Sequence, residues 1–324
     1  MSPTTSHQDP ITPIIHTCFE PVTGTWQYIV ADPITKHAAI IDSVLDFDPA
    51  TSLLKTTSAD HLLTLISQNN LTITHIMETH AHADHLTASR YLQQKLLKTS
   101  HQPQVRPIIC IGKRITQVQS TFAKKYNIPP SELENVFDHL WEDNEVFSIG
   151  DLKGEVLYLP GHTPDHVGYK IEENVFTGDS IFNPDVGSAR ADFPGGSATD
   201  LYRSVQTLLG LPGEVRLYTG HDYPPATREG GGEMGKGKER AYTTVEEQRR
   251  ENKHVKEGTE MSEFVKWRSE RDAQLGEPRL LAWAMQVNVR GGRLPRALEG
   301  GERFFSVPVK GAGDVLEVMA GYYG

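Results

Sequence analysis

Three histidines and one aspartate lie within six residues of the sequence, at His80, His82, Asp84 and His85. Neutral imidazole and carboxylate groups are the side chains with which proteins bind zinc and iron. The run follows an apolar, β-favouring segment and precedes a segment with a helical pattern. Since residues i and i+2 of an extended backbone point to the same side, His80 and His82 can bind one ion. Asp84 and His85 follow where the chain turns and can face a second ion, so the spacing predicts a metal-binding turn between a strand and a helix.

Three more candidate ligands each follow the end of an expected strand. His162, Asp179 and His221 come after apolar segments, and each is preceded directly by glycine. Glycine permits the sharp turn or close approach with which a backbone aims a short side chain at a metal. Because strand ends can gather such groups at one edge of a sheet, we expect a single site. Its seven side chains are His80, His82, Asp84, His85, His162, Asp179 and His221.

The elements that must position these groups follow one pattern in both halves of the chain. Each half reads as short strands that lead into alternating strands and helices. The strands are expected at 14–19, 26–31, 38–42, 71–77 and 107–111, and at 145–149, 154–159, 167–171, 174–177 and 215–218. The helices are expected at 59–68, 86–97, 115–126 and 198–209, the last with Ser197 as its N-cap, and 48–58 is expected to be a loop. This pattern predicts an α/β fold in which two sheets pack face to face with helices outside, a four-layer αββα sandwich.

The composition divides the chain into four segments. Residues 1–13 are polar and are expected to be disordered, and residues 14–223 form the domain that carries all seven groups. Residues 224–240 are rich in glycine and charge, which predicts a flexible surface loop. Residues 241–324 form a helical C-terminal extension that we expect to pack on the same domain.

The overall composition restricts the partners. The net charge of -10 argues against a general nucleic-acid binder, which needs clustered Lys and Arg for phosphate contacts. No apolar run reaches the ~18 residues that a membrane-spanning helix needs, so no membrane partner is expected. The N-terminus lacks the basic and apolar regions of a secretory signal, so we expect a cytoplasmic protein. Cys18 and Cys110 are then expected to be buried free thiols.

The order and spacing of the candidate ligands resemble those of the metallo-β-lactamase superfamily. The run His-x-His-x-Asp-His, followed at intervals by Gly-His, Gly-Asp and Gly-His, carries this likeness over residues 14–223. The resemblance implies the four-layer fold and two metal positions. The implied ligands are His80, His82 and His162 for the first position, and Asp84, His85 and His221 for the second, with Asp179 bridging.

Within the superfamily the chain is most similar to the persulfide dioxygenases, with glyoxalase II somewhat further away. The segments that carry this likeness are 41–48, 78–85, 161–164, 187–195, 221–223, 243–248 and 286–290. The resemblance implies one Fe(II) bound by His80, His162 and Asp179, with three coordination positions left for substrate and oxygen. Arg190 and Tyr223 lie where the family contacts glutathione or orients its sulfur. Family members often dimerise, so a homodimer is a further expectation.

The chain departs from the subgroup pattern near the expected substrate site. Ser43 stands where proline is usual, and Ala191 stands where relatives often carry cysteine. Asp165 and His166 after Gly-His-Thr-Pro are less typical, and the segment from Pro224 replaces a shorter one. These changes spare the metal ligands, which indicates a retained metal scaffold and a changed substrate.

Two reactions on a small-molecule substrate fit this site. The first is oxidation of glutathione persulfide to sulfite with O2 at a single Fe(II), with Arg190 pairing with a substrate carboxylate. The second is hydrolysis of a lactam, lactone or thioester, for which one or two Zn(II) ions lower the pKa of bound water. In the hydrolase, Asp84 orients the hydroxide or takes a proton, and Tyr223 or His221 stabilises the oxyanion. A binding protein without activity would have lost ligands, and none of the seven is lost.

Overall fold

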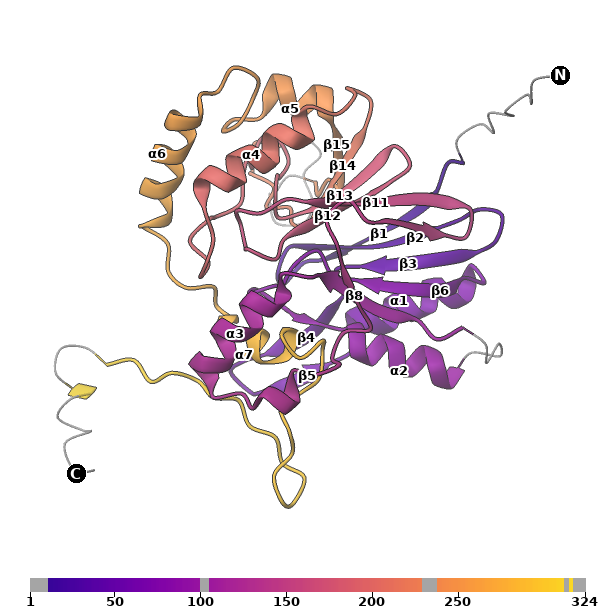
Figure 1. Ribbon diagram of the computed structural model, residues 1–324, viewed down its shortest axis with the longest axis vertical. Coiled ribbons are helices and arrows are strands. Elements are labelled where there is room, and N and C mark those ends of the chain that lie inside the picture. Colours follow the sequence, from indigo (N-terminus) through magenta and orange to yellow (C-terminus); the bar gives the residue numbers. More distant parts are fainter. Residues whose placement is uncertain (1–10, 100–104, 229–237, 312–314, 317–324) are drawn as a thin grey trace.

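Two six-stranded sheets face each other in the computed structural model, and helices cover their outer faces (Figure 1). The structure describes residues 11–99, 105–228, 238–311 and 315–316. In Figure 1 helices α1 and α2 lie below the sheet of the first half, and α4 and α5 lie above the sheet of the second half. This arrangement confirms the prediction of a four-layer αββα sandwich.

The first sheet has the strand order β1-β2-β3-β6-β8-β9. Its strands are β1 (Ile14–Glu20), β2 (Thr25–Ala31), β3 (His37–Ile41), β6 (Thr72–Met77), β8 (Ile108–Gly112) and β9 (His139–Trp141). The first three strands are antiparallel, and β6, β8 and β9 continue the sheet in parallel to β3. A small three-stranded sheet, β5-β4-β7, lies beside it and consists of β4 (Val44–Asp48), β5 (Leu53–Lys55) and β7 (Leu86–Thr87).

The second sheet has the order β10-β11-β12-β13-β14-β15. Its strands are β10 (Val146–Ile149), β11 (Leu152–Tyr158), β12 (Val167–Ile171), β13 (Asn174–Gly178), β14 (Arg216–Thr219) and β15 (Tyr242–Thr244). Strands β10 to β13 form an antiparallel meander, and β14 pairs with β13 in parallel after the crossover through α4 (Ala198–Leu209).

Alternating side chains of the central strands fill two separate cores. In β2, Tyr28 and Val30 face the second sheet, whereas Ile29 and Ala31 face the helices, as the two-residue period of a strand requires. The Tyr28 hydroxyl donates a hydrogen bond of 2.5 Å to the carbonyl of Thr219, so the buried polar group is satisfied across the two sheets.

The helices close both outer faces. They are α1 (Thr57–Gln68), α2 (Ser89–Thr99), α3 (Ile115–Tyr126), α5 (Val245–Glu251), α6 (Met261–Asp272) and α7 (Leu281–Asn288). Helices α1, α2 and α7 contribute buried side chains to the core behind the first sheet, and α4, α5 and α6 do so behind the second. Among the described residues, none of these helices has the length and apolar character to cross a membrane.

Some expected elements differ in the structure. Residues 48–58 were expected to be a loop, but they contain β5 and the first residues of α1. The helix expected at 86–97 begins only at Ser89, because Leu86 and Thr87 pair with β4. β5 forms a short hairpin with β4, and the pairing of β7 with β4 joins two distant segments, which local sequence patterns do not report.

Parts of two predicted segments lie outside the described residues. They are residues 1–10 of the expected disordered N-terminus and residues 229–237 of the glycine-rich loop. The described ends of that loop meet at Asp222, whose carboxylate accepts hydrogen bonds from the Arg228 side chain and the Arg240 backbone. The loop therefore begins and ends next to His221.

Candidate metal centre

All seven predicted ligands come from loops at one end of the sandwich. The loop with His80 to His85 follows β6 of the first sheet, and His162 follows β11 of the second. Asp179 and His221 follow β13 and β14, two adjacent parallel strands, so their loops leave the same edge. The two halves of the fold therefore contribute jointly to the site.

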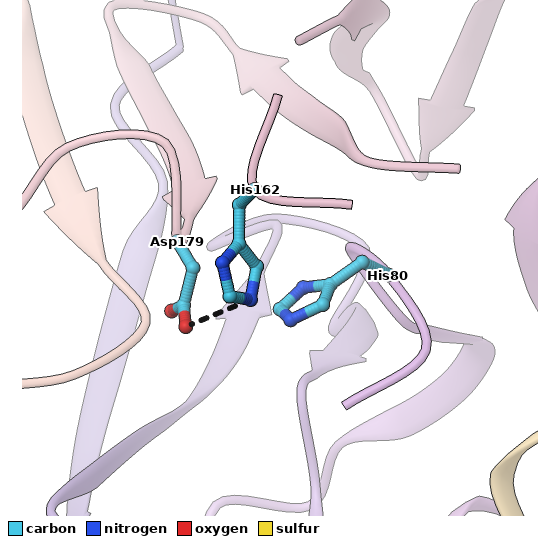
Figure 2. A group of neighbouring side chains, drawn as sticks. All are labelled: His80, His162 and Asp179. Carbon is cyan, nitrogen blue, oxygen red and sulfur yellow. Dashed lines mark ion pairs between the residues drawn. The ribbon is translucent and has the colours of Figure 1, made fainter. Parts of the chain in front are cut away.

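His80, His162 and Asp179 form the first cluster, and one ligand atom of each lies within 4.8 Å of the others. Figure 2 shows the three side chains converging from separate loops, with His162 Nε2 at 3.6 Å from Asp179 Oδ2. All three are buried. Two histidines and one carboxylate form the ligand set of non-haem Fe(II) sites, and the same residues also suit zinc.

His82, Asp84 and His85 form a second cluster beside the first. His221 Nε2 lies 3.3 Å from Asp84 Oδ2 and 3.5 Å from Asp179 Oδ2, so it connects the two clusters. Asp179 contacts both His162 and His221, the position that a bridging carboxylate occupies. The side chains that could bind a second metal ion are thus present as well.

Several donor atoms of these residues are buried without a hydrogen-bond partner. They are Nε2 of His80, Nδ1 of His82, Nε2 of His85, Nε2 of His221 and Oδ1 of Asp179. Each such atom costs about 1–3 kcal/mol when it is left unsatisfied, so five of them in one place are a feature of a ligand site. Divalent cations at the two clusters would satisfy such atoms, and the residues present therefore fit a metal.

Hydrogen bonds to the opposite ring nitrogens orient the imidazoles. His162 Nδ1 lies 2.8 Å from the Arg190 carbonyl, which only accepts, so Nδ1 carries the proton and Nε2 is left for a ligand bond. His82 Nε2 lies 3.1 Å from Asp42 Oδ1 and 3.3 Å from Glu78 Oε2. These contacts leave His82 Nδ1 as its ligand atom.

Asp42 and Glu78 were not among the predicted site residues. Asp42 follows β3 with a positive φ of 53° and also accepts hydrogen bonds from the backbone and hydroxyl of Thr79. Burial disfavours the charged form of His82, but Asp42 and then Glu78 outweigh it and raise the pKa of His82 well above its usual value. The signal in the sequence was a lone acid directly after a strand and another directly before the histidine run, which many turns share.

The surroundings of His80 and Asp84 favour the forms of these two side chains that bind metals. Burial, followed by the neighbouring His82 and His166, lowers the pKa of His80 well below its usual value, so the ring is neutral. For Asp84, burial raises the pKa, but His221 and His85 outweigh it, so the pKa falls well below the usual range and the carboxylate stays charged.

Asp165 and His166, flagged as atypical in the sequence, hold the ligand loops in place. His166 Nε2 accepts a hydrogen bond of 3.0 Å from the backbone N–H of Asp179, and its ring stacks on His80 with centroids 4.7 Å apart. Asp165 Oδ2 accepts a hydrogen bond of 2.9 Å from the N–H of Ala81. The two residues thus connect the loop after β11 to the other ligand loops.

A cavity of about 750 Å³ opens above the metal centre. Asp84, His162, Asp179 and His221 line its floor. The half-exposed Tyr223 lies on one side, where its ring stacks on His221 with centroids 5.6 Å apart. A volume of this size accommodates a substrate of drug-like dimensions.

Arg190, the other predicted substrate contact, also lines the cavity. Its guanidinium, however, is paired with Asp192 through two hydrogen bonds of 2.5 Å and donates a third to the Gly276 carbonyl at 3.0 Å. The guanidinium nitrogen Nη1 of Arg190 donates no hydrogen bond to another described residue.

Comparison with known proteins places the chain in a family. The family model of the metallo-beta-lactamase superfamily matches residues 21–221. A beta-lactamase hydrolase-like protein of Xylella fastidiosa is 43% identical over 92% of this chain, which spans 65% of that protein's length. Glyoxylase B2 of Dictyostelium discoideum is 41% identical, with 88% of this chain and 93% of the relative covered. The mitochondrial persulfide dioxygenase ETHE1 of Homo sapiens is 28% identical, with 86% and 89% covered.

A solved structure agrees with these relatives. The crystal structure of ETHE1 from Myxococcus xanthus is similar with a TM-score of 0.65 and 27% identity, covering 86% of this chain and all of that one. The matched family model covers the positions of all seven candidate ligands. The chain therefore belongs to the metallo-β-lactamase superfamily, whose members are metal-dependent enzymes.

Proposed function

We propose that the chain oxidises glutathione persulfide with O2 and water to glutathione and sulfite at a mononuclear Fe(II) centre. The observation that carries this proposal is the cluster of His80, His162 and Asp179, which is a two-histidine, one-carboxylate set. The likeness to the human persulfide dioxygenase and to the Myxococcus ETHE1 structure supports it.

The side chains around this cluster have distinct roles in the proposal. When bound, iron supplies the oxygen activation that no side chain provides. Tyr223, held by stacking on His221, orients the persulfide sulfur from the side of the cavity. Arg190 contacts a substrate carboxylate through Nη1, and Asp192 fixes its guanidinium plane. His82, Asp84 and His85 tune and orient the centre.

The second candidate function is hydrolysis of a thioester, lactone or lactam with zinc. It is favoured by the second cluster of His82, Asp84 and His85, whose ligand atoms lie as close together as those of the first. In this alternative, zinc would lower the pKa of a bound water, and Asp84 would accept its proton. The hydrolase-like relative from Xylella fastidiosa agrees with this alternative.

Metal analysis combined with O2 uptake distinguishes the two functions. We expect protein purified without added metal to contain iron, to consume O2 with glutathione persulfide and to release sulfite. His80→Ala should lose both bound metal and activity, because it removes a ligand with a buried donor atom. Zinc content without O2 uptake, together with turnover of a thioester or lactam, would show that the hydrolase is the correct function.

His85→Ala provides the matched variant within the second cluster. In the dioxygenase, this variant should keep its iron stoichiometry at saturating metal, because His85 is not a ligand of the single ion. In a two-zinc hydrolase, the same variant should bind half as much metal. Plasma emission spectroscopy on dialysed protein measures the difference.

A further inference from the structure

The turn between β1 and β2 lies directly against the loop of His221. Thr25, the first residue of β2, forms an isolated antiparallel bridge with His221. The Asp222 N–H donates a hydrogen bond of 3.0 Å to the Gly24 carbonyl, and a Cβ on Gly24 would lie 3.1 Å from the Asp222 carbonyl oxygen. The first sheet therefore contributes a second segment to the metal centre, besides the loop that follows β6.

A chain of polar side chains runs from this turn to the imidazole of His221. Thr23 Oγ1 lies 2.6 Å from Glu20 Oε2 and 2.7 Å from Thr25 Oγ1. Thr25 Oγ1 in turn lies 3.3 Å from His221 Nδ1. Glu20, Thr25 and His221 are buried, so both ends of the chain lie inside the protein. A buried carboxylate is thus connected to a candidate metal ligand through two hydroxyl groups.

The short distances determine the direction of each hydrogen bond in this chain. Both oxygens of Glu20 accept bonds of 2.8 Å from the backbone N–H groups of Val22 and Thr23, as a carboxylate does. The single hydroxyl hydrogen of Thr23 therefore points to Glu20. Thr25 supplies the hydrogen between the two hydroxyl oxygens, which would otherwise repel each other at 2.7 Å. Because Thr25 has no hydrogen left for His221, Nδ1 of the ring is the donor of the last bond.

We propose that Glu20, Thr23 and Thr25 are positioning residues of the metal centre, and that they hold a proton on Nδ1 of His221. This hydroxyl relay leaves Nε2 as the ring nitrogen that faces the centre, where it is buried without a hydrogen-bond partner. The relay acts on the ring in either of the two candidate reactions, because His221 belongs to the centre in both.

The relay opposes the carboxylates on the other side of the ring. His221 Nε2 lies 3.3 Å from Asp84 Oδ2 and 3.5 Å from Asp179 Oδ2, and these negative charges attract a proton to Nε2. A proton on Nε2 occupies the lone pair with which the ring binds a cation. Because the relay keeps a proton on Nδ1, a neutral ring has its lone pair on Nε2, ready to bind a metal.

The same arrangement recurs, in a shorter form, at the other end of the second cluster. His82 has the carboxylates of Asp42 and Glu78 directly beside its Nε2. His221 reaches the carboxylate of Glu20 only through the two hydroxyls of the relay. Such partners fix the rotation and tautomer of a ring and raise the basicity of the nitrogen that binds the metal.

Nitrogen NMR of the full chain, labelled with 15N at histidine and freed of metal by a chelator, tests the relay. Protonated and unprotonated ring nitrogens differ in chemical shift, and the signals of His221 are those that disappear in His221→Asn. Burial lowers the pKa of His221, but Asp179 and Asp84 outweigh it and raise the pKa above its usual value. The spectra are therefore recorded at alkaline pH, where the ring is neutral. In the wild type, Nδ1 should be protonated and Nε2 unprotonated.

Thr23→Val is the decisive variant, because Thr25 separates Thr23 from the His221 ring. Without the Thr23 hydroxyl, the Thr25 hydrogen becomes free to donate to Nδ1. The ring proton should then move to Nε2, so that the two nitrogens exchange their chemical-shift types. Thr23→Ser and Thr25→Ser each keep a hydroxyl group and should retain the wild-type spectrum.

Thr17→Val is the matched control, because Thr17 is exposed in β1 of the same hairpin. Its His221 signals should equal those of the wild type. An unprotonated Nδ1 in the wild type would overturn the relay, and so would equal spectra of the wild type and Thr23→Val. The wild-type spectrum tests the direction of the relay even if a valine variant does not fold. Because neither metal nor substrate is present, the result is independent of which reaction the centre catalyses.

Discussion

Single glycines determine how closely the ligand residues approach one another. Gly178, directly before Asp179, has a φ of 48°, and a Cβ at this position would lie 2.5 Å from Thr79 Oγ1 and 2.8 Å from His166 Nε2. Both neighbours hold ligands, since Thr79 precedes His80 and His166 binds the Asp179 backbone. The glycine before Asp179 is therefore required by close packing as well as by its backbone conformation.

Gly178→Ala should weaken metal binding. The added methyl group has to displace Thr79 or His166, and misplacing groups that orient metal ligands lowers affinity by about 10- to 100-fold. Competition with a chromophoric chelator measures the metal affinity. Gly276→Ala is the control, because nothing lies within 4 Å of a Cβ there, and its affinity should be that of the wild type. An unchanged metal affinity in Gly178→Ala would show that the ligand loops can move to accommodate the added methyl group without weakening metal binding.

At this scale, the sequence predicted ligands better than the residues that orient them. Histidine and aspartate behind strand ends predicted seven groups, the structure brings these groups together, and their role as metal ligands stays a prediction. Asp42 and Glu78 escaped prediction because each is an isolated acid. The contact of Asp42 with His82 exists only after β3 and β6 pair, and that of Glu78 depends on the turn that follows β6. The pairing of Arg190 with Asp192 was likewise invisible before folding.

The first turn of helix α4 packs on the loop that carries His162. The Ser197 side chain caps the helix by accepting a hydrogen bond of 3.1 Å from the Asp200 N–H, which confirms its prediction as N-cap. The Ser197 N–H in turn donates to the Gly161 carbonyl at 2.8 Å. A Cβ on Gly161 would lie 2.1 Å from Leu201 N, so the helix start packs directly on the ligand loop.

Ser197→Ala should lower the free energy of unfolding by about 1 kcal/mol, because the first turn loses its side-chain acceptor. Ser197→Asp supplies an acceptor again and should restore most of the stability. Urea denaturation followed by circular dichroism measures both. Ser262→Ala, on the exposed surface of α6, should have no comparable effect. An equally large loss of stability in Ser262→Ala would mean that the missing helix cap does not cause the loss in Ser197→Ala.

Long helices and strands were predicted from the sequence more reliably than short strands. Helix α4 was expected at 198–209 and found there, because a capping serine and an amphipathic period mark it locally. The short strands β4, β5, β7, β9 and β15 were missed. They contain few residues, and most of them pair with a distant segment, as β15 does with β14. The division of the chain at residue 223 stays a prediction.

A partly buried histidine between the two sheets makes the stability of the whole molecule depend on pH. His75 of β6 lies beside Trp141 of the first sheet and Phe147 of the second, with ring centroids 6.1 and 6.2 Å away. Burial, and then the nearby His139, lowers the pKa of His75 from 6.5 to about 4. Below pH 6.5 the unfolded chain binds a proton that the folded chain takes up only near pH 4, so folding becomes less favourable as the pH falls through this range.

His75→Phe should reduce this pH dependence. The wild type should lose roughly 1–2 kcal/mol of stability between pH 7 and pH 5 through His75, after allowance for its partial exposure to solvent. The variant should lose correspondingly less. Urea midpoints measured with a chelator at both pH values make the comparison without a contribution from metal release. The same slope in both proteins would contradict the assignment.

The ligand loops come from both sheets and converge only when the sheets are packed together. One ligand loop follows β6 of the first sheet, and the others follow β11, β13 and β14 of the second. The first half alone holds the cluster of His82, Asp84 and His85, whereas the cluster of His80, His162 and Asp179 is complete only when both halves have folded and packed together. Interactions that form after the folding transition state slow unfolding and leave the folding rate nearly unchanged. A metal bound by His80, His162 and Asp179 would consequently link the two halves late in folding. It would lengthen the lifetime of the native state and increase its resistance to proteolysis.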